Sequence, residues 1–386
     1  MKKEEIMEIE IKSRTIEFAA KILERLFGDD VPVEISATVN GAALTAGVGS
    51  SAASLPLANA RVIEVGEVVA QIGDFIRAVS VFPRRDIAVA SSDDSRAIVF
   101  ADGIRLKLAA RYEKPVRPGK AADDAACAVV DTLELFNAID EVRHAMATDA
   151  DRPSLRSLQL EISDSLRLAV AATDGRRLAF SERQLKDAYV PKAGFQVTLP
   201  AVAVEFALSA PHGERVSIFA EKTAVTILTG NSRGRFFADI AFPKWRTCVV
   251  PEDTPEVAGL PCQETASALR AILTFAGFDE DDDLAYAPHV RITREKDSVE
   301  LKRVVSQNVY ECTGDFTAHI DVGLTEHPPF SVTINAKYLL DALGEHSDGV
   351  IVRTRKDNSD AGCSALRLDF EDDYDIHEVI MPIREI

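Results

Sequence analysis

The sequence predicts an α+β fold made of repeated domains, each with two helices and antiparallel sheets. Short runs of alternating apolar and polar residues, joined by hairpin turns, recur between amphipathic helices. A strand that leads into a helix also occurs twice in matching register, with Phe195/Phe330, Val197/Val332 and Ala201/Ala336 as pairs. At 386 residues the chain is too long for one ordinary core. We therefore expect three units of roughly 125 residues. Their predicted bounds are 1–120, 127–250 and 257–386.

Composition indicates a globular protein of the cytoplasm. Hydrophobic residues make up 46% and charged residues 27%, which excludes a disordered chain. The N-terminal residues lack the apolar stretch of a signal peptide, and no run suits a membrane helix. The cysteines form no Cys-x-x-Cys pair, so neither disulfides nor a zinc site is expected. They are Cys127, Cys248, Cys262, Cys312 and Cys363.

The first predicted helix carries a basic stripe. It follows an alternating strand at 6–11, and Ser13 is its expected N-cap. Apolar residues at helical spacing define one face, and Arg14, Lys21 and Arg25 fall on the opposite face. This stripe suits phosphate contacts, although, taken alone, a solvated face with Glu17 paired to Lys21 is the simpler explanation. The net charge of −18 argues against a surface that binds nucleic acid everywhere.

Five later segments have helical spacing, and two segments have the composition of linkers. The helices are expected at 71–81, 133–147, 267–277 with Ser267 as cap, and from the matched strands to about 209 and 343; the linkers are expected at 113–126 and 251–261.

A hairpin at 171–180 is the most informative local pattern. Asp174-Gly175 is a strong turn signal between two alternating strands. Two arginines, Arg176 and Arg177, follow the turn directly. Taken alone, a surface turn with solvated charges explains them.

Three motifs carry a family resemblance. Thr173-Asp174-Gly175-Arg176-Arg177-Leu178 resembles the Thr-Asp-Gly-His-Arg-Leu motif of the bacterial beta sliding clamp, the processivity factor of the replicative DNA polymerase. Phe242-Pro243-Lys244-Trp245-Arg246 is similar to that family's Phe-Pro-Asp-Tyr-Arg, and Val379-Ile380-Met381-Pro382-Ile383-Arg384 to its Val-Val-Met-Pro-Met-Arg ending. Their order, spacing and the internal repeat also agree.

The resemblance implies a head-to-tail homodimer whose six domains form a ring around duplex DNA, bound without sequence preference. It also implies a groove that holds short linear peptides of the replicative polymerase, the clamp loader and repair proteins. The implied groove residues are Leu155, Thr173, Gly175, Arg176, Arg177, Leu178, Pro243, Met381, Pro382 and Ile383.

Further residues are carried over for DNA and for the ring interface. Arg152 and Arg156 join the basic stripe as candidate DNA contacts. The edge strand with Leu106 and Leu108 and the helix with Ile272 and Leu273 resemble the dimer contacts, although ordinary core packing also explains the helix residues. The chain departs from the family at Arg176, at Thr247-Cys248 and at the additional Glu385-Ile386, which leaves the ligand preference open.

Nothing in the sequence indicates catalysis, a cofactor or a metal. Asp174 before Gly175 is a structural turn residue, and the acidic run 279–283 lacks the spacing of a calcium loop. The seven histidines form no spaced metal set. We therefore expect a non-catalytic sliding clamp; the alternative is a clamp-derived interaction scaffold that does not encircle DNA.

Overall fold

The computed structural model describes most of the chain. The described residues are 7–92, 96–109, 113–149, 151–278, 287–295, 298–304, 316–322, 330–344, 346–354, 365–371 and 375–383. The acidic run, Cys312, Cys363, Arg384 and the last two residues lie outside this part.

The chain divides into two compact units, which are described separately. Unit 1 contains Met1–Ile139, Gln159–Leu168 and Gln184–Ala241, and unit 2 contains Asp140–Leu158, Ala169–Arg183 and Phe242–Ile386. Helix α3 (Thr132–Val142) and strands β11 (Ser157–Ile162) and β12 (Arg167–Thr173) include residues of both units.

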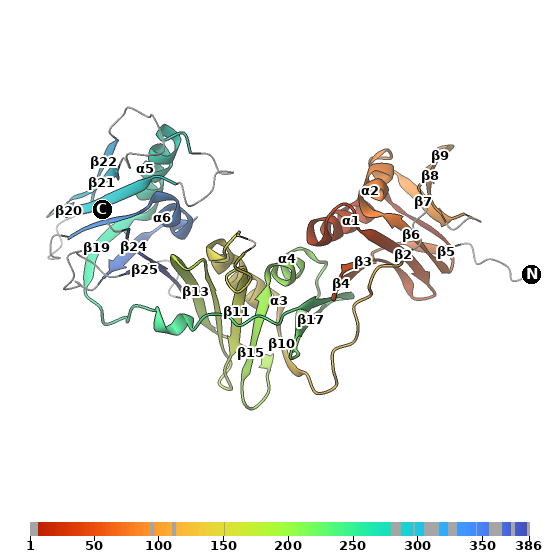
Figure 1. The fold of residues 1–386 in the computed structure, drawn as a ribbon, viewed down its shortest axis with the longest axis horizontal. Coiled ribbons are helices and arrows are strands. Elements are labelled where there is room, and N and C mark those ends of the chain that lie inside the picture. Colours follow the sequence, from red (N-terminus) through yellow and green to blue (C-terminus); the bar gives the residue numbers. More distant parts are fainter. Residues whose placement is uncertain are drawn as a thin grey trace, which may run out of the picture. The chain divides into compact units, whose positions relative to one another are not determined.

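Two antiparallel sheets and three further helices form unit 1 (Figure 1). The helices are α1 (Ser13–Phe27), α2 (Ile72–Ser80) and α4 (Ala201–Ser209). One sheet has the order β5 (Arg61–Glu64), β1 (Glu8–Lys12), β7 (Asp86–Ser91), β8 (Ala97–Ala101) and β9 (Ile104–Lys107). The other has the order β14 (Ala188–Tyr189), β10 (Ala126–Asp131), β16 (Arg215–Ala220), β17 (Ala224–Thr229), β18 (Ser232–Phe237), β4 (Ser51–Leu57), β3 (Gly41–Val48), β2 (Pro32–Thr38) and β6 (Gly66–Gln71). Strand β15 (Phe195–Pro200) leads directly into α4.

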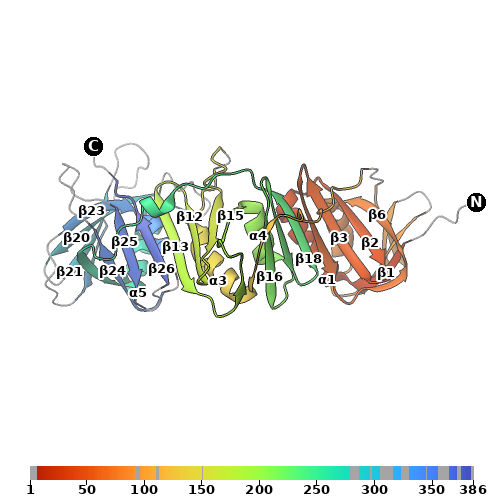
Figure 2. The ribbon, with the colours of Figure 1, turned by 90° about the horizontal axis from the view of Figure 1, so that it is seen from below.

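The pairing of β18 with β4 joins the first predicted repeat to the second. Arg233 lies opposite Ser54, and Arg235 lies opposite Ala52. Figure 2 shows β16 and β18 continuing into β3 and β2 as one layer. Because the backbone groups of both edges are paired, this junction is part of a continuous sheet rather than a side-chain contact between separate domains.

Unit 2 repeats the same plan with two helices. They are α5 (Cys262–Phe275) and α6 (Ala336–Leu343), which contact each other. One sheet contains, in order, β13 (Arg177–Gln184), β26 (Ile376–Ile380), β25 (Leu366–Phe370), β24 (Gly349–Arg353) and β19 (Glu256–Pro261). The other has the order β22 (Thr317–Asp321), β21 (Ser298–Val304), β20 (His289–Glu295) and β23 (Phe330–Asn335).

The predicted secondary structure is confirmed at most elements. Helix α1 buries the expected face, including Ile16 and Leu23, each at 0% exposure. The Asp102-Gly103 turn has positive φ at both residues, as a tight hairpin turn requires. The matched segments at Phe195 and Phe330 both form a strand followed by a helix.

Two helix starts were wrong. Ser13 is the first residue of α1, not its cap; its hydroxyl accepts from the backbone N–H of Arg85 at 3.2 Å. Helix α5 begins five residues before Ser267, whose hydroxyl instead donates to the carbonyl of Gln263 at 2.8 Å. The buried residues of its first turns, such as Cys262, are small and differ little in hydropathy from their exposed neighbours. The apolar periodicity is therefore weak there, and the sequence pattern does not reveal where the helix begins.

Two further boundaries also differ. The predicted linker 251–261 ends in strand β19, which pairs with β24. The helix expected at 133–147 ends at Val142 and continues as a single 3₁₀ turn, Arg143–Ala145. The division into three clamp-type domains stays a prediction.

None of the helices that the structure describes combines the length and the apolar character needed to cross a membrane.

Candidate functional site

The turn between β12 and β13 is held by its own polar groups. The Thr173 hydroxyl donates to the carbonyl of Arg177 at 2.6 Å and accepts from the N–H of Gly175 at 3.0 Å. Asp174 Oδ1 accepts the backbone N–H groups of Arg176 and Arg177. Gly175 has φ of +88°, which favours glycine. Thr173 and Asp174 therefore shape the turn, and their hydrogen-bonding atoms are already occupied.

Arg177 is buried in a network and exposes only 3% of its surface. Its guanidinium donates to Asp174 Oδ2 at 3.2 Å and to Asp341 Oδ2 at 2.7 Å. It also donates to the carbonyl of His144 at 2.6 Å and lies 4.6 Å from the ring centroid of Tyr338. These partners satisfy a charge that would otherwise be costly to bury.

The C-terminal motif lies beside this turn because β13 pairs with β26. Arg177 is opposite Ile380 in the register. Past the strand, the N–H of Met381 donates to the carbonyl of Arg176 at 2.9 Å, and that of Ile383 donates to the carbonyl of Thr333 at 2.8 Å. The backbone thus places Met381 directly against the turn.

Two other predicted segments join the same region of unit 2. A Cβ atom built on Gly175 would lie 3.6 Å from Cδ1 of Leu155, which places that side chain beside the turn. Trp245 belongs to a buried cluster that includes Leu178, and Phe242 packs against this cluster. Pro243 lies between Phe242 and Trp245 in the chain. Trp245 also lies 5.3 Å from the ring of Phe180, centroid to centroid.

The structure therefore separates the predicted groove residues into two groups. Thr173, Arg177 and Leu178 are buried and support the region from below. The others are exposed or half-buried, and we call them the turn surface: Leu155, Gly175, Arg176, Pro243, Met381, Pro382 and Ile383.

Arg176 acts electrostatically on two neighbouring side chains. Burial lowers the pKa of His289, and the charge of Arg176 lowers it further. Burial and the charge of Asp174 raise the pKa of Tyr338, whereas Arg177 and a hydrogen bond with Arg176 oppose that rise. The charge of Arg176 therefore opposes protonation of His289 and favours ionisation of Tyr338.

Two of the three candidate DNA contacts of unit 1, Lys21 and Arg25, are already paired with carboxylates. Lys21 Nζ lies 2.7 Å from Glu17, and Arg25 Nη1 lies 2.8 Å from Glu205 on α4. All three basic residues of the stripe, Arg14 included, are exposed. In unit 2, Arg152 Nε lies 3.9 Å from Asp149, and Arg156 is half-buried.

The interface candidates fall in different environments. Ile272 and Leu273 are 0% and 6% exposed and belong to the core of unit 2, so core packing accounts for them. Leu106 on the edge strand β9 and Leu108, which follows directly after its end, are half-buried. On α5, Phe275 is 67% exposed and stacks on Phe316, with 5.7 Å between ring centroids.

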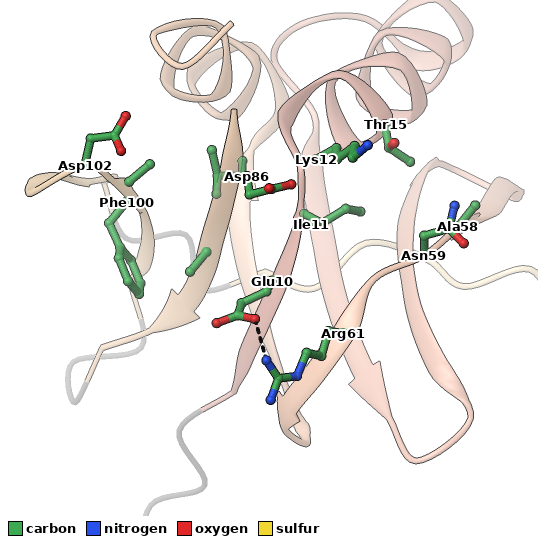
Figure 3. A pocket seen from close by; sticks show the side chains of 13 residues that line it. Glu10, Ile11, Lys12, Thr15, Ala58, Asn59, Arg61, Asp86, Phe100 and Asp102 are labelled. Atoms are coloured by element: carbon green, nitrogen blue, oxygen red, sulfur yellow. Dashed lines mark hydrogen bonds and ion pairs between the residues drawn. The ribbon is translucent and has the colours of Figure 1, made fainter. Parts of the chain in front are cut away.

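A separate cavity of about 640 Å³ lies in unit 1 (Figure 3). Its lining includes the ion pair of Glu10 with Arg61, and Asp86 and Lys12 lie near the start of α1. None of the predicted site residues lines it. Throughout the described residues, no three His, Cys, Asp or Glu side chains gather closely enough to hold a metal ion.

Sequence reasoning missed the partners that come from the third repeat. Tyr338 and Asp341 lie on α6, more than 150 residues from the turn, and carry no local signal of a site. Phe275 could have been found, because an aromatic residue on the polar face of an amphipathic helix is unusual.

Comparisons with known proteins agree with the motifs. Residues 129–243 match the family model of the DNA polymerase III beta subunit, central domain. The beta sliding clamp of Caulobacter vibrioides is 27% identical over 266 residues, 66% of this chain and 66% of that relative, just under two thirds of its length.

Solved structures show the same fold. The beta sliding clamp of C. crescentus superposes with a TM-score of 0.80 over 99% of this chain and all of that chain, at 21% identity. The Helicobacter pylori beta clamp bound to a DNA ligase peptide superposes with a TM-score of 0.78 over 98% of this chain and all of that chain, at 16% identity.

Proposed function

We propose that this chain, which belongs to the beta sliding clamp family as a divergent member, encircles duplex DNA as a head-to-tail homodimer and tethers partner proteins to it. The partners would be the replicative polymerase, the clamp loader and repair proteins, each docking through a short linear peptide. The protein itself would perform no chemistry.

The observation that carries this proposal is the turn surface. Three segments far apart in the sequence meet there. The β13–β26 pairing brings the C-terminal motif to the turn, and the segment 242–245 packs against Leu178 of β13. Leu155, Met381 and Ile383 offer apolar contacts, and the flexible thioether of Met381, half of it exposed, adapts to several ligand shapes. An apolar surface with a few placed polar groups suits a leucine or phenylalanine anchor. The H. pylori clamp with its ligase peptide supports this kind of partner.

The strand edges support a ring. Within the chain, predicted repeats join through paired edges, β4 with β18 and β13 with β26. Strands β9 and β22 end their sheets, so within the described residues each leaves one edge unpaired. Ile104 on β9 is 50% exposed, and Phe275 packs on Phe316 just before β22. A second chain that pairs these edges head to tail would repeat the internal junctions and close the ring.

One observation favours the scaffold that does not encircle DNA. The cations Lys21, Arg25 and Arg152 all face carboxylates, which lowers their attraction for phosphate. Exposed pairs of this kind are weak, however, and DNA phosphates can replace the carboxylates at a cost of about 1 kcal/mol or less per pair.

Topological retention on DNA tests the proposal. The protein is incubated with a clamp loader and ATP on nicked circular DNA, which is then linearised. A clamp remains on the circle and is released from the linear form, whereas a bound scaffold is released equally from both. A control clamp is loaded onto the same circle by the same loader. If the circle retains the control clamp but does not retain this protein, encirclement is refuted.

A further inference from the structure

A row of polar side chains crosses four strands on one face of the larger sheet of unit 1. It takes one residue from each of β2, β3, β4 and β18, each directly opposite the next in the register: Glu34, Thr45, Ser54 and Arg233. Residues directly opposite each other in antiparallel strands present their side chains on the same face. A carboxylate, two hydroxyls and a guanidinium therefore lie side by side across the junction of β4 with β18.

This row lines a cavity of about 430 Å³, which we call the junction cavity. The other lining residues include Arg117 and Pro118 from the linker, and Asn231 and Ser232 from the turn between β17 and β18. Most of the lining is polar, and none of the predicted site residues belongs to it. The volume lies in the range of sites that bind small organic molecules.

The buried carboxylate of the junction cavity is already neutralised. Glu34 is only 1% exposed, and Arg117 donates to its Oε1 at 2.6 Å and to its Oε2 at 3.2 Å. This bidentate geometry compensates a charge that would otherwise be costly to bury. Arg117 also donates to Glu67 at 2.6 Å, and Lys114 pairs with the same carboxylate. Two carboxylates thus meet two cations, and Glu34 adds no net negative charge to the cavity.

Three donor groups of the lining remain available to a ligand. Arg233 is half-buried and forms no ion pair with any carboxylate in the part of the chain that the structure describes. Its backbone is fixed, because β18 pairs with β17 on one side and with β4 on the other. The Ser54 hydroxyl accepts from Thr45 at 3.0 Å, which leaves its own proton to donate. The side-chain amide of Asn231 is exposed at the turn. The cavity thus has one unpaired positive charge and two neutral donors.

We propose that the junction cavity binds the phosphate group of a small phosphorylated molecule, with Arg233 as its main contact. A guanidinium pairs with phosphate through two parallel N–H···O bonds. A phosphate monoester carries a charge of about −1.5 to −2 at pH 7 and has more acceptor oxygens than a carboxylate, which suits separate donors on Arg233, Ser54 and Asn231. The rest of the cavity accommodates the organic part of the ligand. The cavity shares no residue with the turn surface, so the inference does not depend on the proposed clamp function.

Two matched sets of probes test the site by isothermal titration calorimetry with the full-length protein. One set is glucose 6-phosphate, glucose and glucuronate, which share a sugar and differ in a phosphate, hydroxyl or carboxylate group. The other set is adenosine monophosphate and adenosine, and inorganic phosphate is measured beside both. The variants are Arg233→Ala, Arg233→Lys and Ser54→Ala. Lys222→Ala, an exposed change in the hairpin between β16 and β17, is the matched control, and thermal melting checks that each variant is folded.

The phosphorylated member of at least one set is expected to bind about tenfold more tightly than its unphosphorylated counterparts and than inorganic phosphate. Added salt weakens this binding. Arg233→Ala lowers the affinity about tenfold, and Arg233→Lys lowers it less, because lysine keeps the charge but loses the bidentate geometry. Ser54→Ala, which removes one neutral donor, lowers it about two- to fivefold. Lys222→Ala leaves it unchanged.

Several outcomes overturn the inference. If neither phosphorylated probe shows saturable binding, the cavity is not a phosphate site. If glucuronate binds as tightly as glucose 6-phosphate, or inorganic phosphate as tightly as both esters, the cavity holds small anions without selecting a phosphorylated molecule. If a folded Arg233→Ala protein keeps the full affinity, the probes bind elsewhere. If Arg233→Ala weakens binding of duplex DNA and leaves the affinities of all probes unchanged, the guanidinium contacts the DNA backbone instead.

Discussion

Arg177 and Asp341 are separated by 164 positions in the chain, yet the Nη1 atom of Arg177 donates to Oδ2 of Asp341 over 2.7 Å. The bond connects the turn after β12 to helix α6. The same guanidinium contacts Asp174 in its own turn and the His144 carbonyl, so three separate parts of unit 2 meet at one buried charge. The family motif suggests Arg177 as a ligand contact, whereas here its buried side chain holds these segments together.

Replacing Arg177 with alanine is expected to destabilise the protein by about 3–5 kcal/mol, because it leaves the carboxylates of Asp174 and Asp341 without their buried partner. Urea unfolding followed by circular dichroism measures the loss. Arg176→Ala, one residue away and exposed, is the matched control and is expected to change stability by no more than about 0.5 kcal/mol. Equal effects of the two changes would contradict the structural role.

Freeing Arg25 from its partner is expected to strengthen DNA binding. Glu205→Gln removes the carboxylate 2.8 Å from the guanidinium of Arg25. Affinity for duplex DNA at low salt should rise about two- to fivefold, and the slope of log affinity against log salt should steepen by about one. Glu214→Gln, an exposed change in the same unit, controls for net charge. If both variants gain equally, only the overall charge matters and the basic stripe has no specific role.

The proposed dimer is expected to depend on Phe275 rather than on Leu273, the contact that the family resemblance implies. Phe275→Asp places a charge on an exposed ring and should yield folded monomers in sedimentation equilibrium. Leu273→Asp places a charge in the core of unit 2 and should lower the melting temperature by itself. A Phe275→Asp protein that remains dimeric would exclude this face as the interface.

Asp369 is expected to make the free energy of unfolding depend on pH below about pH 4. Burial alone would raise its pKa from 3.8, but hydrogen bonds from His377 and Arg367 lower it to about 2. A carboxyl whose pKa is lower in the folded state stabilises the fold fully above its unfolded pKa. This contribution, on the order of 2 kcal/mol, is lost as the pH falls from about 4 to about 2.

Unfolding free energies measured across this range test the assignment. Asp369→Asn should show a smaller decrease between these pH values than the native protein. An identical decrease in both proteins would assign the acid sensitivity to other carboxyl groups.

Local pattern was enough to predict much of this protein. The Asp174-Gly175 turn, the basic face of α1 and the strand-to-helix transitions at Phe195 and Phe330 all depend on contacts within a few residues, which periodicity and turn chemistry report directly. Element boundaries were less certain where small residues weakened the pattern, as at Cys262 in α5.

Tertiary structure alone decided the role of each residue at the candidate site. The sequence presents Arg176 and Arg177 as neighbours with the same chemistry. Alternation along β13 and the approach of α6 bury Arg177 against Asp341, whereas Arg176 stays in solvent beside Met381. Leu273 and Phe275 on α5 likewise differ by only two positions, and burial separates core from candidate interface. Burial depends on elements distant in the sequence, and no local pattern reports those contacts.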